Sequence, residues 1–488
     1  FTNLTTSLIP LRLKTINTHR VLGCSIYKLR AISLIESIVI CLISYILALF
    51  IVNDLSYTPI ANWVDADIRL SQYKGLILLT ALIAILTGCL AGLYPAIRST
   101  SYAPALVLKG SFGLSPKGKK VRVALIGFQY TVSIALIIVT LFMGLQNHFM
   151  TSSEQLGFNK DQVAIVNLTP EIYAKHKPQY IQKLKDYPGI EDVAFSVYEL
   201  SKEDDMIDLE YARHEDKDVF FKVFYASENF LSVMDIQVEE GRDFTREDLN
   251  KAQSDYIINP AAERDFHLHP GDRFNDRTVL GVSKDFRFNS CRIASSPFVF
   301  ALNNDIPNPK LVSYIRFNSK TNLQEAVAHV RETLKEIDPT FPFEISFYNT
   351  ILNNLYQKEQ TLGKLISLFG IMAILISIVG VFGLVLFETQ YRRKEIGIRK
   401  INGATTGQIL LMFNKTYIRI VSVCFIISIP IAWMGTQQWL ENFAYKTPLH
   451  LWVFIVAFLI ILSVTIGTVT FRNWQAANEN PVNSVKSE

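Results

Sequence analysis

Six stretches of the chain are apolar over about 20 residues, the length of helix that crosses the hydrocarbon core of a bilayer. Helices buried in a soluble core are normally shorter and carry a polar stripe along one side. The pattern therefore predicts six membrane-spanning helices. They cover residues 32–52, 76–97, 121–144, 362–387, 417–439 and 451–471.

A segment of soluble character, residues 148–361, separates the third predicted span from the fourth. Residues 163–167 and 193–197 have the composition of strands, and residues 178–185 between them have a helical pattern. Residues 322–337 form a second amphipathic helix, with apolar side chains recurring at helical spacing. The expected fold class is therefore an α-helical membrane bundle combined with a mixed α/β domain.

The charges divide along the same boundaries. The chain holds 48 Lys and Arg against 44 Asp and Glu, but residues 150–361 alone hold 24 basic and 35 acidic side chains. The remainder holds 24 basic and 9 acidic, a net charge of +15, much of it in the connections at 98–122 and 388–416. Because Lys and Arg are retained on the cytoplasmic side of a membrane, we expect both termini in the cytoplasm and the α/β domain outside. Basic residues placed between apolar runs also argue against a nucleic-acid partner.

Two cytoplasmic segments resemble each other. Residues 18–25 read Thr-His-Arg-Val-Leu-Gly-Cys-Ser and residues 398–405, 380 positions later, read Ile-Arg-Lys-Ile-Asn-Gly-Ala-Thr; two predicted spans follow each. Each copy then ends in small residues with a proline, at 103–108 and 480–485. We infer an internal duplication whose first copy lacks a helix–domain–helix unit, either by truncation or by natural absence. The predicted parts are the end of a first repeat (1–120), a membrane helix (121–147), the extracytoplasmic domain (148–361) and a second repeat with three spans (362–488).

One connection nearly matches a phosphate-binding loop. Residues 113–120 read Gly-Leu-Ser-Pro-Lys-Gly-Lys-Lys, but Lys120 replaces the Ser or Thr that binds Mg²⁺ and Pro116 interrupts the turn. We therefore expect a basic connector and no nucleotide site. The chain also lacks a Gly-x-Ser-x-Gly motif, and its outer domain shows no pattern of nucleophile and base. The sequence thus predicts neither an enzyme nor a cofactor.

Two clusters in the outer domain contain metal-ligand side chains. The first consists of Glu263, His267, His269 and Asp272, and the second of Glu203, Asp204, Asp205, Asp208 and Glu210. The first has no second group of ligands elsewhere in the sequence, and the second has no glycine-bearing calcium loop. We expect a solvated turn and a solvated acidic edge, and no metal.

The basic connection between the fourth and fifth spans has a pattern of its own. Ile396, Ile398 and Ile401 alternate with charged residues in a stretch too polar to insert into a membrane. This pattern predicts a short amphipathic helix at the membrane surface that ends near Gly403. Two interpretations remain open, a segment that only sets topology and contacts lipid, and a lever presented to a cytoplasmic partner.

The same segment carries a family resemblance. The run from Lys394 to Lys400, Lys-Glu-Ile-Gly-Ile-Arg-Lys, followed by Gly403-Ala404, resembles the signature of FtsX-domain permeases, the MacB-like branch of ABC transporters. Further similar motifs are Glu36-Ser37, Tyr94–Arg98 with Pro104, Gly241–Phe244, Ile257–Ala262, Gly281–Phe286 and Asn480–Val482. The resemblance implies that the outer domain is a MacB-like periplasmic core domain. Duplicated members of the family have eight spans and two such domains, against six and one here.

The resemblance also implies a function, a permease subunit in a bacterial inner membrane that couples a separate cytoplasmic ATPase dimer to motion of the outer domain. Such mechanotransmission would export or extract a peptide, lipoprotein or lipid; the alternative is a non-transporting regulator of a cell-wall hydrolase or a sensor. Membrane lipid and a periplasmic adaptor or outer-membrane protein are the other implied partners. The ATPase-coupling residues carried over are Lys394, Glu395, Ile396, Gly397, Ile398, Arg399, Lys400, Gly403 and Ala404. The first copy matches less well, at His19, Arg20, Val21, Leu22 and Gly23.

Overall fold

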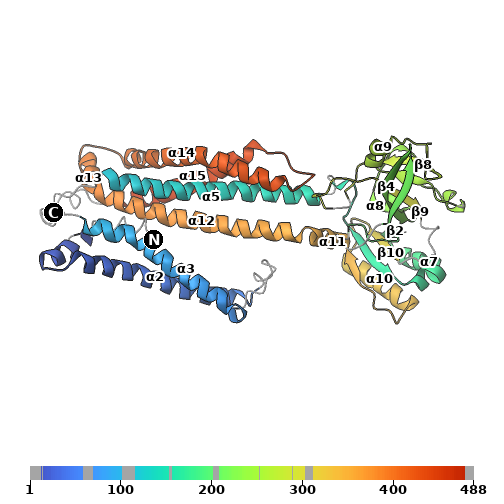
Figure 1. The fold of residues 1–488 in the computed structure, drawn as a ribbon, viewed down its shortest axis with the longest axis horizontal. Helices are drawn as coiled ribbons and strands as arrows, with labels where there is room; N and C mark the ends of the chain where they lie inside the picture. The colour runs from blue at the N-terminus through green and yellow to red at the C-terminus, as the bar shows by residue number, and fades with distance from the viewer. Residues whose placement is uncertain are drawn as a thin grey trace. The chain divides into compact units, whose positions relative to one another are not determined.

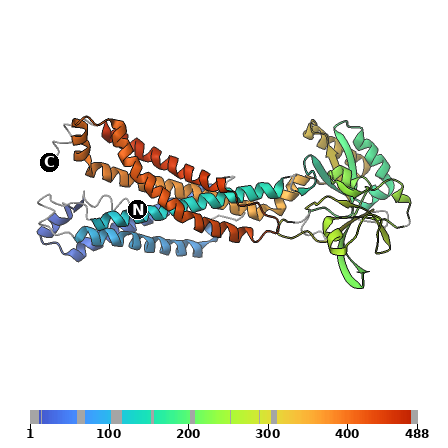
Figure 2. The ribbon, with the colours of Figure 1, turned by 90° about the horizontal axis from the view of Figure 1, so that it is seen from above.

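The chain forms two compact units, one helical and one built around a sheet (Figures 1 and 2). The computed structural model describes residues 12–13, 15–58, 70–101, 116–152, 156–201, 208–251, 253–287, 290–302 and 311–478. The helical unit comprises residues 1–143, 361–438 and 449–488, and the sheet unit residues 144–360 together with 439–448. The connection between the last two long helices therefore belongs to the sheet unit.

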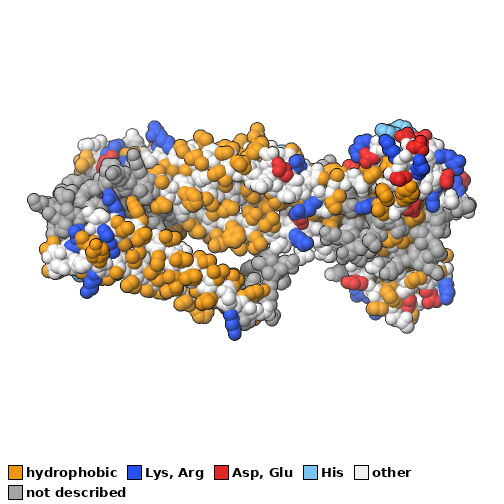
Figure 3. Space-filling view, in the orientation of Figure 1, with side chains coloured by type: hydrophobic (Ala, Val, Ile, Leu, Met, Phe, Trp, Pro, Cys, Tyr) orange, Lys and Arg blue, Asp and Glu red, His pale blue; other side chains and the backbone are white. Residues whose placement is uncertain are grey.

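Six helices in the described residues are long and apolar enough to cross a membrane, as the sequence predicts. They are α2 (Ile26–Leu55), α3 (Lys74–Thr100), α5 (Pro116–Thr151), α12 (Gln357–Tyr391), α14 (Thr406–Leu440) and α15 (Leu451–Ala477). Figure 3 shows hydrophobic side chains covering much of the helical unit, whereas charged side chains gather on the sheet unit. Because so much exposed apolar surface is unfavourable in water, a bilayer is the solvent that suits these helices.

Small and polar residues join the long helices. In the pair α2–α3, a Cβ atom on Gly92 would meet the Ser37 Oγ at 2.5 Å, so glycine permits the close approach. Glu36, the acidic residue of the first predicted span, forms an ion pair with Arg12 (2.8 Å). Four hydroxyl and amide pairs join α5, α12, α14 and α15, namely Ser133–Ser377, Tyr130–Thr465, Thr389–Asn473 and Asn414–Thr470.

The sheet has the strand order β11-β1-β10-β2-β4-β9-β6-β8-β5, with β3 paired to β4 and β7 to β8. The strands are β1 (Val163–Leu168), β2 (Ile190–Ser196), β3 (Asp208–His214), β4 (Lys217–Ala226), β5 (Val238–Gly241), β6 (Tyr256–Ile258), β7 (Arg273–Phe274), β8 (Arg277–Ser283), β9 (Phe298–Leu302), β10 (Leu311–Phe317) and β11 (Ile345–Phe347). Both β1 and β2 pair antiparallel with β10. The two strands predicted at 163–167 and 193–197 are therefore not direct neighbours, because β10 lies between β1 and β2.

Helices cover both faces of this sheet. Alternate residues of β1 point to opposite faces, so Val166 belongs to the core under α7 (Pro170–Lys185) and α10 (Leu323–Ile337). Ile165 belongs to the other core, with α8 (Phe230–Met234) and α11 (Tyr348–Leu355). The fold class predicted from the sequence, a helical membrane bundle with a mixed α/β domain, is confirmed.

One predicted helix begins at the wrong residue. The pattern placed its start at Pro178, but α7 begins at Pro170 and passes through Pro178 without ending. Pro170 occupies the first helical turn, where a missing N–H costs nothing. Pro178 is exposed, so water can hydrogen-bond the carbonyl group that lacks a helical partner.

Candidate functional site

The segment between α12 and α14 forms a separate short helix, α13 (Arg393–Ile401), which confirms the predicted amphipathic helix. Glu395 lies in its first turn and Arg399 and Lys400 in its last, an order that complements the helix dipole. Ile396 is buried, whereas Ile398 and Ile401 are 49% and 65% exposed. Because Ile398 and Ile401 are three residues apart, they lie on the same exposed side of the helix.

Arg392 connects α13 to both neighbouring helices. Its guanidinium group pairs with Glu388 of α12 at 3.1 Å and approaches Glu395 of α13 at 3.9 Å. The same group lies 5.8 Å from the ring centre of Phe413 in α14. The hydroxyl of Tyr417, also in α14, donates to the second Glu388 oxygen (3.3 Å). Arg392 therefore joins the start of α13 to both α12 and α14.

Glu395 and Arg399 form an ion pair across one turn of α13 (2.9 Å). Both side chains are about half exposed, at 42% and 52%. Exposed pairs at this spacing stabilise a helix by only about 0.3–0.5 kcal/mol. The helix does not depend on this pair, and both charges remain accessible to a partner.

A glycine turn joins α13 to α14. The amide of Gly403 donates to the Lys400 carbonyl (3.0 Å), and the amide of Ala404 donates to the Arg399 carbonyl (2.9 Å). Gly403 has a φ of +87°, a left-handed conformation that favours glycine. Thr405 and Gln408 then cap α14 reciprocally, each side chain accepting from the other's backbone N–H (3.1 and 3.3 Å).

The first copy repeats this turn at the same spacing. Gly23 has a φ of +91° and donates to the Arg20 carbonyl (3.0 Å), and Cys24 donates to the His19 carbonyl (3.0 Å). Each of these residues lies 380 positions before its counterpart in the second turn. The start of α2 precedes that of α14 by the same 380 positions, and both ends of α3 precede those of α15 by 377. The two turns, and the pairs of long helices that follow them, therefore recur at nearly constant spacing along the chain.

Several candidates lie wholly or partly outside the described residues. Residues 113–115 of the loop resembling a phosphate site are among them, and residues 116–120 begin α5. The acidic residues 203–205 and the proline stretches at 103–108 and 480–485 also lie outside.

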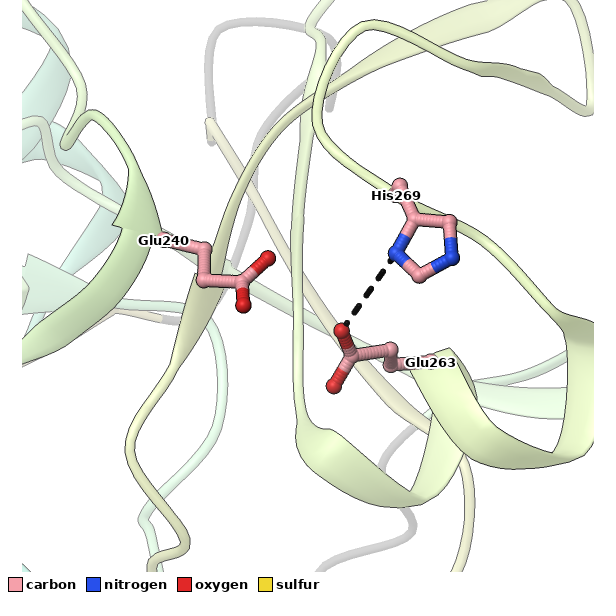
Figure 4. Close-up of side chains that lie close together, drawn as sticks. All are labelled: Glu240, Glu263 and His269. Atoms are coloured by element: carbon pink, nitrogen blue, oxygen red, sulfur yellow. Dashed lines mark ion pairs between the residues drawn. The ribbon is translucent and has the colours of Figure 1, made fainter.

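Three of the described outer-domain side chains approach one another as metal ligands would (Figure 4). Glu240 at the end of β5 joins Glu263 of α9 (Pro260–Phe266) and His269, with ligand atoms within 4.8 Å of one another. Asp272 instead accepts from the backbone amide of His269 (2.8 Å), and His267 ends α9. Sequence reasoning missed Glu240 because strand pairing brings it to the turn. Glu240 and His269 are exposed, and water suffices to solvate them, so the cluster gives no reason to infer a metal.

The outer-domain motifs that resemble the family have structural roles. Gly241 pairs with Gly281 across β5 and β8, where a Cβ on Gly281 would meet the carbonyl oxygens of Glu240 and Arg242 at 2.7 and 2.9 Å. Asn259 is buried; its Oδ1 accepts from the amides of Ala262 and Phe298, which caps α9 and holds the start of β9. These motifs therefore stabilise the sheet rather than form a reactive site.

Comparisons with known proteins agree with the family resemblance of the sequence. The model of the FtsX-like permease C-terminal family matches residues 1–104 and 367–481, one match in each copy. The macrolide export ATP-binding/permease protein MacB of Aggregatibacter actinomycetemcomitans is 25% identical over 212 residues, 41% of this chain and 32% of that protein. MacB of Neisseria gonorrhoeae is 25% identical over 223 residues, 43% of this chain and 34% of that protein. The chain thus spans about a third of the length of these relatives.

Two solved structures are similar to part of this chain. The periplasmic region of MacB from Actinobacillus actinomycetemcomitans is 16% identical and covers 41% of this chain and 94% of its own, with a TM-score of 0.31. The extracellular domain of the noncanonic ABC-type transporter YknZ from Gram-positive bacteria is 17% identical and covers 38% and 99%, with a TM-score of 0.29. Residues 1–104 and 367–481 thus match one permease family, and the chain, whose described residues include six helices long and apolar enough to cross a membrane, resembles FtsX-like permeases of the MacB-like type.

Proposed function

We propose that the chain is the permease subunit of an ABC transporter and that α13 receives the motion of a separate cytoplasmic ATPase dimer. The observation that carries this proposal is the way α13 is built. It exposes Ile398, Ile401 and the charges of Glu395 and Arg399, while Arg392 fixes it to α12 and α14. A helix that is exposed on one side and anchored on the other suits a mechanical lever.

The proposal places α13 and both termini in the cytoplasm of a bacterial cell and residues 148–361 on the far side of the inner membrane. The unequal charges of the connections support this orientation. The transported material would be a peptide, lipoprotein or lipid, handled by the outer domain, with a periplasmic adaptor or outer-membrane protein as a further partner. The first copy keeps the Gly23 turn but lacks the Glu-Ile-Gly of the second, so it would bind the ATPase less tightly.

Co-purification tests the coupling role. Glu395→Arg combined with Arg399→Glu preserves an ion pair but reverses both charges presented to a partner. We expect association with the ATPase to fall about tenfold or more, as for a well-placed interface residue. Glu171→Lys with Lys175→Glu is a matched control, because these residues form an exposed pair of the same spacing in α7 (2.8 Å).

Undiminished association and ATP-dependent activity in the α13 variant would contradict the proposal. The regulatory alternative makes the same demand on α13 and differs in what the outer domain contacts. Cross-linking from the outer domain would capture an adaptor or channel in the case of transport, and a cell-wall hydrolase or sensor in the case of regulation.

A further inference from the structure

Two loops of the sheet unit meet at the connection between the last two long helices. One is residues 439–448, which joins α14 to α15, and the other is residues 290–296, which leads into β9. The Tyr445 amide donates to the Cys291 carbonyl (3.1 Å), and the Tyr445 hydroxyl accepts from the Ser295 amide (3.1 Å). We call residues 290–296 and 439–448 the juxtamembrane loops.

The chain itself keeps these loops close to the membrane helices. α14 ends at Leu440 and α15 begins at Leu451, so Tyr445 lies no more than six residues from either helix. An extended chain spans about 3.5 Å per residue, which places Tyr445 within about 20 Å of both helix ends. Gln146 of α5 holds this segment through hydrogen bonds to the Tyr445 carbonyl (3.0 Å) and the Thr447 amide (2.8 Å). Because α14 and α15 suit a bilayer, the juxtamembrane loops belong near its surface.

Tryptophan residues mark the same ends of α14 and α15. Three of the five tryptophans in the chain are Trp433 and Trp439 of α14 and Trp452 of α15. Trp433 and Trp452 are 38% and 48% exposed. Trp and Tyr gather where the hydrocarbon of a membrane meets its headgroups. These aromatic side chains therefore favour a position of the juxtamembrane loops at the level of the lipid phosphates.

The juxtamembrane loops differ in charge from the outer domain as a whole. With 24 basic and 35 acidic side chains, residues 150–361 carry a net charge of −11. Arg287 and the two loops together hold three basic side chains, Arg287, Arg292 and Lys446, against the single acidic Glu441. An anionic membrane surface attracts each nearby Lys or Arg by about 1 kcal/mol and repels acidic side chains. This part of the domain is therefore suited to anionic lipid.

Two aromatic rings hold Arg287 in place. Its guanidinium group lies 5.1 Å from the ring centre of Phe149, near the end of α5, and 4.2 Å from that of Tyr445. Cation–π contacts of this kind fix the group but do not use its hydrogen-bond donors. A planar guanidinium group that is already fixed loses little entropy when it binds a phosphate.

Arg292 combines a fixed charge with an exposed apolar neighbour. Its Nε donates to the buried Glu359 carboxylate (2.7 Å), and its guanidinium group lies 5.0 Å from the ring centre of Phe443. The Arg292 side chain nevertheless remains 46% exposed, and the adjacent Ile293 is 59% exposed. A cation beside an apolar side chain matches a phospholipid, whose phosphate adjoins its acyl chains. Inorganic phosphate would leave Ile293 in water.

We propose that the juxtamembrane loops bind an anionic phospholipid of the adjacent leaflet. Arg287 and Arg292 contact the phosphate, which planar guanidinium groups bind through paired hydrogen bonds. Ile293 lies against the glycerol and the first carbons of the acyl chains. Lipid binding here does not require α13 to contact an ATPase.

Native mass spectrometry of the full chain in detergent tests this site. The probe is dioleoylphosphatidylglycerol, and the measured quantity is the Kd of the first bound lipid. In Arg287→Gln with Arg292→Gln we expect this Kd to rise about tenfold or more, since both phosphate contacts are lost. Dioleoylglycerol, which has the same acyl chains but no phosphate, should bind the unmodified chain at least about tenfold more weakly. Arg331→Gln, which changes an exposed arginine of α10, is the matched control and should leave the Kd unchanged.

Two single variants apply if the double variant fails to fold. Arg287→Lys keeps the charge but loses the planar group, and Ile293→Ser leaves both arginines and the Glu359 pair intact. Each should raise the Kd about threefold. Excess inorganic phosphate should not displace the lipid. An unchanged Kd in both single variants, or equal binding of the two lipids, would overturn the site. Displacement by phosphate with no effect of Ile293→Ser would also overturn it, because the loops would then bind a free anion only.

Discussion

Arg242 and Asp248 form an ion pair with two contacts in the sheet unit. The guanidinium group contacts both carboxylate oxygens (2.7 and 2.9 Å), and Thr245 donates to the same carboxylate from its amide and its hydroxyl. The Asp248 side chain is 2% exposed. The Arg242 guanidinium group, followed by these Thr245 bonds, lowers the pKa of Asp248 well below its usual range.

The lowered pKa predicts how stability depends on pH. A carboxyl group whose pKa is lower in the folded state stabilises the fold above its unfolded pKa of about 3.9 and loses this contribution as pH falls toward its folded pKa. Asp248→Asn should therefore reduce the free energy of unfolding of the sheet unit by about 1.5–3 kcal/mol at pH 7, because a buried carboxylate loses its charge-assisted hydrogen bonds to the half-exposed Arg242 and to Thr245. It should also flatten the pH dependence below about pH 4.

Pulse proteolysis of the full chain in urea at pH 7 and at pH 3.5 measures both effects. Asp216→Asn is the control, because Asp216 is almost fully exposed in its pair with Arg213 and should contribute less than about 0.5 kcal/mol. Equal stability of Asp248→Asn and the unmodified chain at pH 7 would show that the Arg242–Asp248 pair contributes nothing.

At the scale of single elements, the turn after α13 depends on glycine. An added Cβ on Gly403 would meet no atom within 4 Å, so only its φ of +87° opposes another residue. Gly403→Ala should cost about 1 kcal/mol and speed exchange of the Gly403 and Ala404 amides about fivefold. Gly407→Ala, inside α14 and without a positive φ, should leave these amides unchanged or slow them. If both alanine variants exchange alike, the left-handed turn is not what limits the opening of α13.

The same elements show what can be read from sequence alone. The end of α13 near Gly403 and the six long helices follow from local pattern, because apolar runs and a single glycine determine them. Three features could not be predicted from the sequence. They are the position of β10 between β1 and β2, the approach of Glu240 to His269, and the hydrogen bonds of Gln146 to Tyr445 and Thr447. Each depends on residues far apart in the chain that only the folded sheet brings together.

At the scale of the whole molecule, the charge division predicts an orientation that can be measured directly. Net charge is −11 over residues 150–361 and +15 over the rest. We expect the sheet unit outside and the α13 turn in the cytoplasm, because Lys and Arg near the ends of spans resist translocation. In a chain whose five cysteines are replaced, Lys320→Cys should react with a membrane-impermeant thiol reagent in intact spheroplasts. Asn402→Cys should react only after permeabilisation, since both positions are exposed in the fold and differ only in side of the membrane. The reverse labelling pattern would show that α13 lies outside the cytoplasm, where it could not contact a cytoplasmic ATPase. Labelling of both positions in intact spheroplasts would show that the chain inserts in two orientations.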